Sequence, residues 1–260
     1  MNKKKKQIGP PPFDTQATVT IFNKIFMVTD LSQNISMDNP TFPGHLRTVI
    51  WDHLTMEETI KLGYTKKPYC YRVKGFMMCD HTSTHVDAIN HIVARPDARA
   101  VDKLPLTWSM APGVWFDFSE SSKNSYITVQ DVKKAIKITK VKLPRNGVVL
   151  YYTGWSKKWQ NPYEYIKDYP GMDRSAMEYL ADRGIICVGA DAPSIDSYAE
   201  VKTVRIQPAH IVCREREILN IENLGRVDRI PKHEFFFIGL PLKIKESSGS
   251  PIRAVAITEK

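Results

Sequence analysis

The chain has 260 residues, of which 42% are hydrophobic and 25% are charged, and it carries a formal net charge of +9. A chain of this length can bury roughly 70–75% of the surface it exposes when unfolded, so a substantial core is available. Its apolar runs are far shorter than the ~18–20 residues needed to cross a bilayer, which excludes a membrane-spanning protein.

Part of the positive charge comes from a lysine run, Lys3–Lys6, inside a segment (residues 1–15) that continues with three prolines. We predict that residues 1–15 are a disordered lead-in, and no apolar stretch follows that would make them a secretory signal. Elsewhere basic and acidic residues alternate, which favours a solvated surface over a nucleic-acid site. The four cysteines form no C-x-x-C pair, so we expect reduced thiols and a cytoplasmic location.

Residues 16–260 are predicted to form a single α/β domain with a mixed β-sheet and flanking helices. Short β-like runs occur at 19–22, 114–118, 147–152, 185–189, 235–240 and 253–257. The runs at 147–152 and 185–189 are almost continuously apolar, which is typical of strands covered on both faces. One helix is predicted to begin at Thr128, with Asp131 completing a capping box. A second is predicted to begin near Asp173 and to end at Gly184, which makes 147–189 a candidate right-handed βαβ crossover.

Three of the seven histidines fall close together, in the pattern His81-x3-His85-x-Asp87-x3-His91. Imidazole and carboxylate are ligands for divalent cations such as Zn²⁺, Mn²⁺ or Fe²⁺. His81 and His85 would share a face of a helix, whereas His85 and Asp87 would share a face of a strand. No regular element points all four groups one way, so an irregular segment leading into a helix is predicted. The alternative is that the three histidines have unrelated capping, core and surface roles; the interleaved aspartate favours metal binding.

This segment resembles the H-x-G-T-H-x-D-x-P-x-H signature of the cyclase family of metal-dependent hydrolases, which includes bacterial kynurenine formamidase and isatin hydrolase. The resemblance continues at Gly189–Asp196, at His210 followed by Glu222, and in the C-terminal stretches 240–244 and 249–254. It covers roughly residues 25–258 and implies a swivelling β/β/α-like fold. Two positions depart from the pattern: Ser83 replaces the family glycine and Ile89 the family proline.

The resemblance implies two divalent cations per chain, Zn²⁺ or Mn²⁺. His81, His85 and Asp87 would hold one cation, and Asp87 would bridge to a second cation held by His210 and Glu222. His91 would act as the general acid/base in hydrolysis by metal-activated water. The family also implies a homo-oligomer, a dimer or a tetramer.

The substrate site is less closely defined by the sequence. Aromatic residues near the motifs could line an apolar pocket or could simply be core: Trp51, Phe76, Trp108, Trp155 and Trp159. Asp191, Ser194 and Asp196 follow a predicted strand, where ligand contacts are common in α/β sheets; local turn hydrogen bonds are the alternative. His45, His53 and His233 belong to no motif, so no role is predicted for them.

We therefore expect a hydrolase of a non-peptide C–N bond in a small molecule, either an aryl formamide such as N-formylkynurenine or a cyclic amide. Lactone hydrolysis or a dehydrative cyclisation at the same site is one alternative. A non-catalytic metal-binding homologue is the other, although storage of a metal would not need a free His91.

Overall fold

The structure, a computed structural model, describes residues 15–92, 95–120, 125–203 and 207–260. Nearly all of the predicted lead-in, including the lysine run, lies outside the described residues. The strands are β1 (Gln16–Ile21), β2 (Lys24–Asp30), β3 (Val49–Leu54), β4 (Val73–Met77), β5 (His85–Asp87), β6 (Met110–Asp117), β7 (Tyr126–Ile127), β8 (Gly147–Tyr152), β9 (Gly171–Met172), β10 (Ile185–Ala190), β11 (Leu219–Glu222), β12 (Glu234–Ile238), β13 (Gly249–Pro251) and β14 (Val255–Glu259). The α-helices are α1 (Met56–Lys61), α2 (Val129–Thr139), α3 (Pro162–Tyr165), α4 (Arg174–Ala181), α5 (Tyr198–Thr203) and α6 (Pro208–Glu215).

A ten-stranded mixed sheet forms the body, in the order β1-β2-β14-β12-β6-β8-β10-β11-β5-β13. The central strands β6, β8, β10 and β11 run parallel, and the outer strands are antiparallel. Parallel strands require long connections, and β8 reaches β10 through α3, β9 and α4. The predicted α/β class with a mixed sheet is confirmed, and β8 and β10 are the predicted parallel neighbours.

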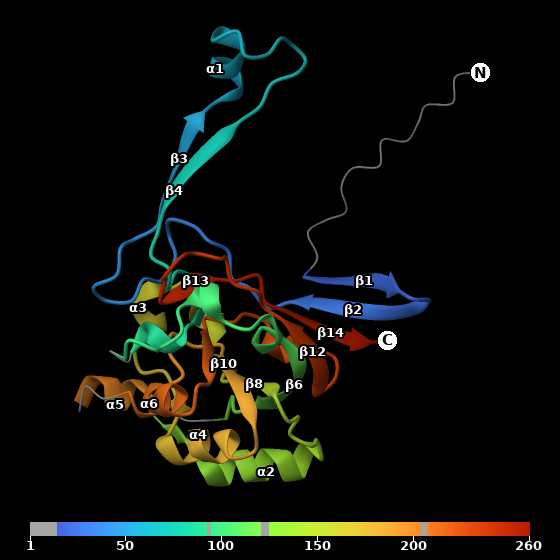
Figure 1. Cartoon of the computed structure of the whole chain (residues 1–260), viewed down its shortest axis with the longest axis vertical. Helices are drawn as coiled ribbons and strands as arrows, with labels where there is room; N and C mark the ends of the chain where they lie inside the picture. The colour runs from blue at the N-terminus through green and yellow to red at the C-terminus, as the bar shows by residue number, and fades with distance from the viewer. Residues whose placement is uncertain (1–14, 93–94, 121–124, 204–206) are drawn as a thin grey trace.

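Each face of the sheet has its own core. Helices α2, α4 and α6 cover one face, where Val149 and Tyr151 of β8 meet the apolar sides of the helices (Figure 1). On the opposite face Val148 and Leu150 pack with residues from both ends of the sheet, including Val86 of β5 and Ala256 of β14. Because alternate residues of β8 enter different cores, the strand is apolar throughout, as the sequence predicted.

The two predicted helices form where their caps indicated. Thr128 accepts a hydrogen bond from the backbone N–H of Asp131, whose carboxylate accepts one from the N–H of Thr128, so α2 begins with a capping box. Asp173 caps α4 by accepting from the N–H of Ala176. Gly184 follows with a φ of 79°, a conformation that glycine adopts without strain.

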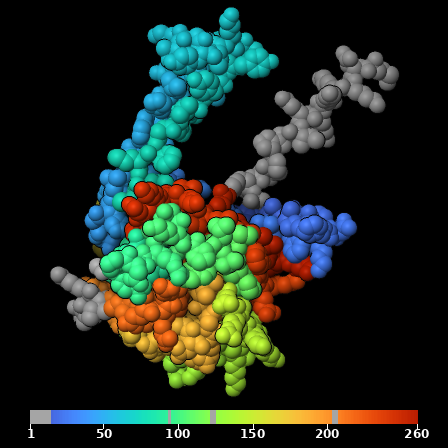
Figure 2. Space-filling view, in the orientation of Figure 1, coloured from blue at the N-terminus to red at the C-terminus, as the bar shows by residue number. Residues whose placement is uncertain are grey.

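One segment stands apart from the body. Strands β3 and β4, with α1 beyond them, project as an arm outside the packed core, and a space-filling view shows the arm as a separate protrusion (Figures 1 and 2). β3 and β4 form their own two-stranded antiparallel sheet. No helix in the described ranges is long and apolar enough to cross a membrane.

Candidate metal centre

The histidine segment is neither one helix nor one strand. It starts with a turn, continues as the three-residue strand β5 and ends in a 3₁₀ turn, Ile89–His91. β5 lies antiparallel to β11, with His85 opposite Glu222 and Asp87 opposite Asn220. This pairing brings Glu222, which is distant in sequence, beside the histidine cluster. The predicted irregular segment is therefore observed, with a short strand at its centre.

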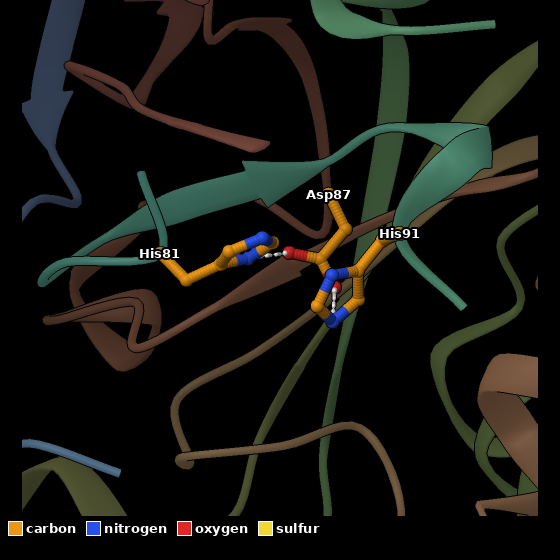
Figure 3. A group of neighbouring side chains, drawn as sticks. All are labelled: His81, Asp87 and His91. Atoms are coloured by element: carbon orange, nitrogen blue, oxygen red, sulfur yellow. Dashed lines mark hydrogen bonds and ion pairs between the residues drawn. The ribbon is translucent and has the colours of Figure 1, made fainter. Parts of the chain in front are cut away.

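Asp87 lies at the centre of the site. Its carboxylate is almost completely buried, and His81 and His91, whose ring centroids are 4.0 Å apart, each lie beside a different carboxylate oxygen (Figure 3). Nδ1 of His81 is 2.7 Å from Oδ1, and Nε2 of His91 is 3.8 Å from Oδ2. Two sets of three residues place candidate ligand atoms within 4.8 Å of one another: His81, Asp87 and His91, and His85, Asp87 and Glu222.

The ring nitrogens of two buried histidines are fixed by partners outside the site. Nδ1 of His85 lies 2.8 Å from the carbonyl oxygen of Ser83, so it donates there and presents an Nε2 lone pair to the centre. Nδ1 of His210 is likewise bonded to the carboxylate of Asp196. An imidazole oriented in this way through its second nitrogen is typical of metal-ligating histidines.

The Nε2 atoms of His85 and His210 both face carboxylate oxygens. Nε2 of His85 is 3.3 Å from Oδ1 of Asp87 and 3.6 Å from Oε2 of Glu222. Nε2 of His210 is 3.4 Å from Oδ2 of Asp87 and 3.2 Å from Oε1 of Glu222. Each carboxylate thus turns one oxygen toward each imidazole. Oε1 of Glu222 is buried without a well-aligned hydrogen bond to the described residues, so imidazole nitrogens and carboxylate oxygens converge where a proton or a metal cation would hold them together.

The carboxylates also govern the charge of these imidazoles. Burial opposes a charge on His85, but the hydrogen bond to Asp87 and the charges of Asp87 and Glu222 outweigh it and raise its pKa to about 9. The pKa of His210 is raised well above its usual value, because the charge of Asp196 and the hydrogen bonds to the carboxylates outweigh burial. An arrangement that favours a proton at these nitrogens also favours a metal cation in its place.

A buried arginine lies behind the centre. The Arg214 guanidinium donates to Oδ1 of Asn220 at 2.7 Å, and the Asn220 amide donates to Oδ2 of Asp87, also at 2.7 Å. Nη2 of Arg214 is itself 3.6 Å from Oδ2 of Asp87. Asn220 and Arg214 therefore fix the orientation of Asp87 and offset part of its negative charge.

His91 occupies a different position from the other histidines. Its side chain is about a quarter exposed, and burial lowers its pKa to about 4, against the opposing charge of Asp87. The ring borders a cleft with His81, His85, His210 and Glu222. His91 is therefore a neutral imidazole at the mouth of the centre, available to accept a proton.

The structure does not bring the predicted substrate residues together around the cleft. Ser194 lines the cleft. Asp191 is buried and accepts from the backbone N–H and hydroxyl groups of Thr153 and Ser156, which follow β8 and are distant in sequence. It does not border the cleft, and these bonds are not the local turn hydrogen bonds given as the alternative. Trp155 is buried in the helix-side core, where its indole N–H donates to the carbonyl oxygen of Tyr165, and it does not border the cleft.

Trp51 and Phe76 do not border this cleft at all. They lie on β3 and β4 of the projecting arm, where their side chains are 46% and 63% exposed. The sequence places both residues near the histidine motif, but a β-ribbon carries them away from it. In this chain's own cleft the structure therefore gives them no contact with a substrate.

Comparison with known proteins identifies the family. Residues 29–197 match the family model described as "Putative cyclase". The chain belongs to the cyclase family. It is 27% identical to a kynurenine formamidase of Paracidovorax citrulli over 235 residues, which is 89% of this chain and 97% of that protein. It is 27% identical to an isatin hydrolase of Roseibium aggregatum over 196 residues, 70% of this chain and 73% of that protein.

The fold agrees with this cyclase-family membership. The structure of isatin hydrolase A from Labrenzia aggregata, bound to benzyl benzoate, superposes with a TM-score of 0.78 at 23% identity and covers 90% of this chain and 94% of that one. The predicted resemblance to the family is confirmed. The named relatives are hydrolases, and the buried His and carboxylate clusters of this chain suggest a divalent metal.

The two departures from the cyclase-family signature have different consequences. Ser83 has a φ of 58°, the left-handed region in which glycine is unstrained and serine costs about 1 kcal/mol. Its hydroxyl donates to the carbonyl oxygens of Gln33 and Asn34, which offsets that cost. Ile89 is fully buried in the core opposite the helices. Neither change removes a candidate ligand.

Some residues of the cleft were not predicted from the sequence. His45, Phe42, Tyr165 and Asn223 border it, although the sequence analysis gave none of them a role. Asn223 donates to the carbonyl oxygen of Ser83 and accepts from the Tyr165 hydroxyl at 3.0 Å. The position of Asn223 directly after Glu222 was the one available signal in the sequence.

Proposed function

We propose that this protein is a metal-dependent amidohydrolase that cleaves a non-peptide C–N bond in an aryl formamide, such as N-formylkynurenine, or in a cyclic amide. The observation that carries the proposal is the convergence of the His85 and His210 ring nitrogens on the carboxylate oxygens of Asp87 and Glu222, beneath a cleft that His91 borders. The names of the relatives support the substrate class.

We further propose two divalent cations, Zn²⁺ or Mn²⁺. His85 and His210 would each bind one, and Asp87 and Glu222, which turn one oxygen toward each imidazole, would span the pair. His81, 2.7 Å from Asp87, would complete the first site. Cations bound there would supply Lewis-acid chemistry, making hydroxide available near neutral pH and stabilising negative charge on the substrate carbonyl oxygen.

The remaining steps belong to the chain's own groups. A neutral His91 would take a proton from the nucleophile at Nε2 and return it to the leaving nitrogen, which must be protonated before the C–N bond breaks. Phe42, Tyr165, Ile166 and Pro193 form an apolar and aromatic wall of the cleft that suits a planar aryl group. The four cysteines are free thiols, which supports a reducing, cytoplasmic location.

The test is a substrate panel with metal-loaded protein. Aryl formamides, isatin-like lactams and lactones are assayed with Zn²⁺-, Mn²⁺- and Fe²⁺-loaded protein, after elemental analysis of protein purified without chelator. We expect up to two ions per chain and turnover of an amide. Turnover of lactones alone would replace the amide substrate, and protein that neither contains nor rebinds metal would refute the proposal. His233→Ala is the control histidine, because its ring bonds to the Trp115 carbonyl oxygen away from the cleft.

A further inference from the structure

The ring of His81 lies between two acidic residues. Its Nδ1 atom is 2.7 Å from Oδ1 of Asp87, as the dashed line in Figure 3 shows. Its Nε2 atom is 2.9 Å from the hydroxyl oxygen of Ser248 and 3.7 Å from Oδ1 of Asp80. The Ser248 hydroxyl in turn lies 3.0 Å from Oδ2 of Asp80. The nitrogen of His81 that carries the proton therefore decides which nitrogen is left to bind a cation.

The position of the His81 ring is set by its neighbours. β13 pairs with β5, which places Gly249 opposite Asp87 and brings Ser248 beside the histidine segment. A Cβ on Gly249 would come within 2.6 Å of the His81 ring, so the ring lies directly against the backbone of β13. The ring of His91 is also close, with 4.0 Å between the two centroids. Packing fixes where the two nitrogens lie, and their hydrogen bonds decide which of them is protonated.

Ser248 has one hydroxyl proton and two neighbours that could accept it, Asp80 and His81. Oδ2 of Asp80 also accepts from the Ser247 hydroxyl at 2.7 Å and from the backbone N–H of Ser248 at 3.2 Å. Such a set of converging donors suits an ionised carboxylate, and a hydrogen bond to an ionised group is about twice as strong as one between neutral groups. The Ser248 proton therefore goes to Asp80, and the Ser248 oxygen is left to accept from Nε2–H of His81.

We propose that Asp80 and Ser248 are positioning residues that hold a proton on Nε2 of His81 and so direct Nδ1 toward a metal cation beside Asp87. The inference rests on the proposed function, in which His81 completes the first cation site. A metal-ligating histidine typically donates its other ring N–H to a carboxylate or another acceptor, which fixes the ring and makes it a stronger ligand. In this chain the carboxylate acts through a serine hydroxyl.

The same contacts disfavour the opposite tautomer. If only Nδ1 carried a proton, Ser248 would have to donate to Nε2 of His81, and Asp80 would lose its bond from this hydroxyl. The proton on Nδ1 would also block the position beside Asp87. A ring protonated on both nitrogens keeps the bonds of Ser248 unchanged, and a cation then has to displace only the proton on Nδ1.

The first test is chelator-competition titration of the full chain with Zn²⁺. Ser248→Ala removes the hydroxyl that links Asp80 to His81. Ser247→Ala is the matched control: it removes a neighbouring hydroxyl that donates to the same oxygen of Asp80 but is not bonded to His81 among the described residues. Circular dichroism and thermal unfolding of the metal-free variants report whether each keeps its fold.

The second test reads the proton itself. Nitrogen-15 NMR of protein labelled at histidine distinguishes protonated from unprotonated ring nitrogens, and comparison with His81→Gln identifies the His81 signals. We expect the metal-free wild type to carry a proton on Nε2 of His81 and to keep it when Zn²⁺ is added. Metal-free Ser248→Ala should shift this proton toward Nδ1, where Asp87 accepts it. A role of Ser248 in folding alone would not move these signals.

We expect Ser248→Ala to bind Zn²⁺ about 10–100-fold more weakly than the wild type, and Ser247→Ala to bind it nearly as tightly. A folded Ser248→Ala protein with wild-type affinity, an equal loss in Ser247→Ala, or zinc-bound His81 with its proton on Nδ1 overturns the proposal. The wild-type spectrum decides the matter if Ser248→Ala misfolds. A wild type that binds no Zn²⁺ would instead refute the proposed function and, with it, the role of Nδ1 as a ligand.

Discussion

Asp196 offers the sharpest test of how the metal centre is built. Its carboxylate accepts from the backbone N–H groups of Ala209 at 2.6 Å and His210 at 3.3 Å, and it bonds Nδ1 of the His210 ring. Gln207, the residue at the N-cap of α6, makes no side-chain capping bond, so Asp196 caps this helix from another segment. One side chain thus stabilises the helix and sets which nitrogen of His210 carries the proton.

The perturbation is Asp196→Asn. The amide keeps an acceptor for the helix N–H groups but presents N–H in place of the second oxygen, so His210 would have to turn an Nδ1 lone pair toward it. The ring proton then moves to Nε2 and blocks the lone pair that faces Asp87 and Glu222. Loss of such an orienting partner typically lowers metal affinity 10–100-fold, and disturbing a buried charge-assisted bond costs about 1–3 kcal/mol of stability.

The assay combines chelator-competition titration with Zn²⁺ and thermal unfolding of the metal-free protein. The matched control is Asp173→Asn, which alters the N-cap of α4 but contacts no histidine. Asparagine is as good a cap as aspartate, so this control should leave both metal affinity and stability nearly unchanged. A folded Asp196→Asn protein with wild-type zinc affinity would show that the tautomer argument is wrong.

Three further predictions concern the same centre. His91→Ala should retain metal by elemental analysis while turnover falls by about 10²–10⁴, because it removes proton transfer and no ligand; equal loss of metal and turnover would make His91 a ligand instead. Gly249→Ala places a Cβ 2.6 Å from the His81 ring, so this ring must move, and we expect weaker metal binding in the same titration with an intact fold by circular dichroism. Arg214→Met leaves Asp87 without its buried cationic neighbour, and denaturant unfolding of the metal-free protein should show a loss of about 3–5 kcal/mol. An unchanged unfolding midpoint would show that Arg214 contributes nothing to the folded state.

Local signals explain which parts of the fold the sequence predicted. The capping pair Thr128 and Asp131 and the cap Asp173 act within a few residues, so their helices begin where expected. The apolar run 147–152 reports burial on both faces, which the two cores confirm. The arm was not predicted. β3 and β4 contain apolar residues, as buried strands do, so their sequences do not reveal that they lie outside the core.

The sequence by itself determined the chemistry available to this protein: a family signature, a cluster of imidazoles and carboxylates, and free thiols. Only the tertiary structure decided which of these groups meet. The antiparallel pairing of β5 with β11 brings Glu222 to His85, and the bond from Asp196 aims His210 at Asp87, although neither contact is local in sequence. The same long-range geometry carries Trp51 and Phe76 away from the cleft on the arm. Distances between segments depend on strand order and packing, and one-dimensional spacing does not encode them.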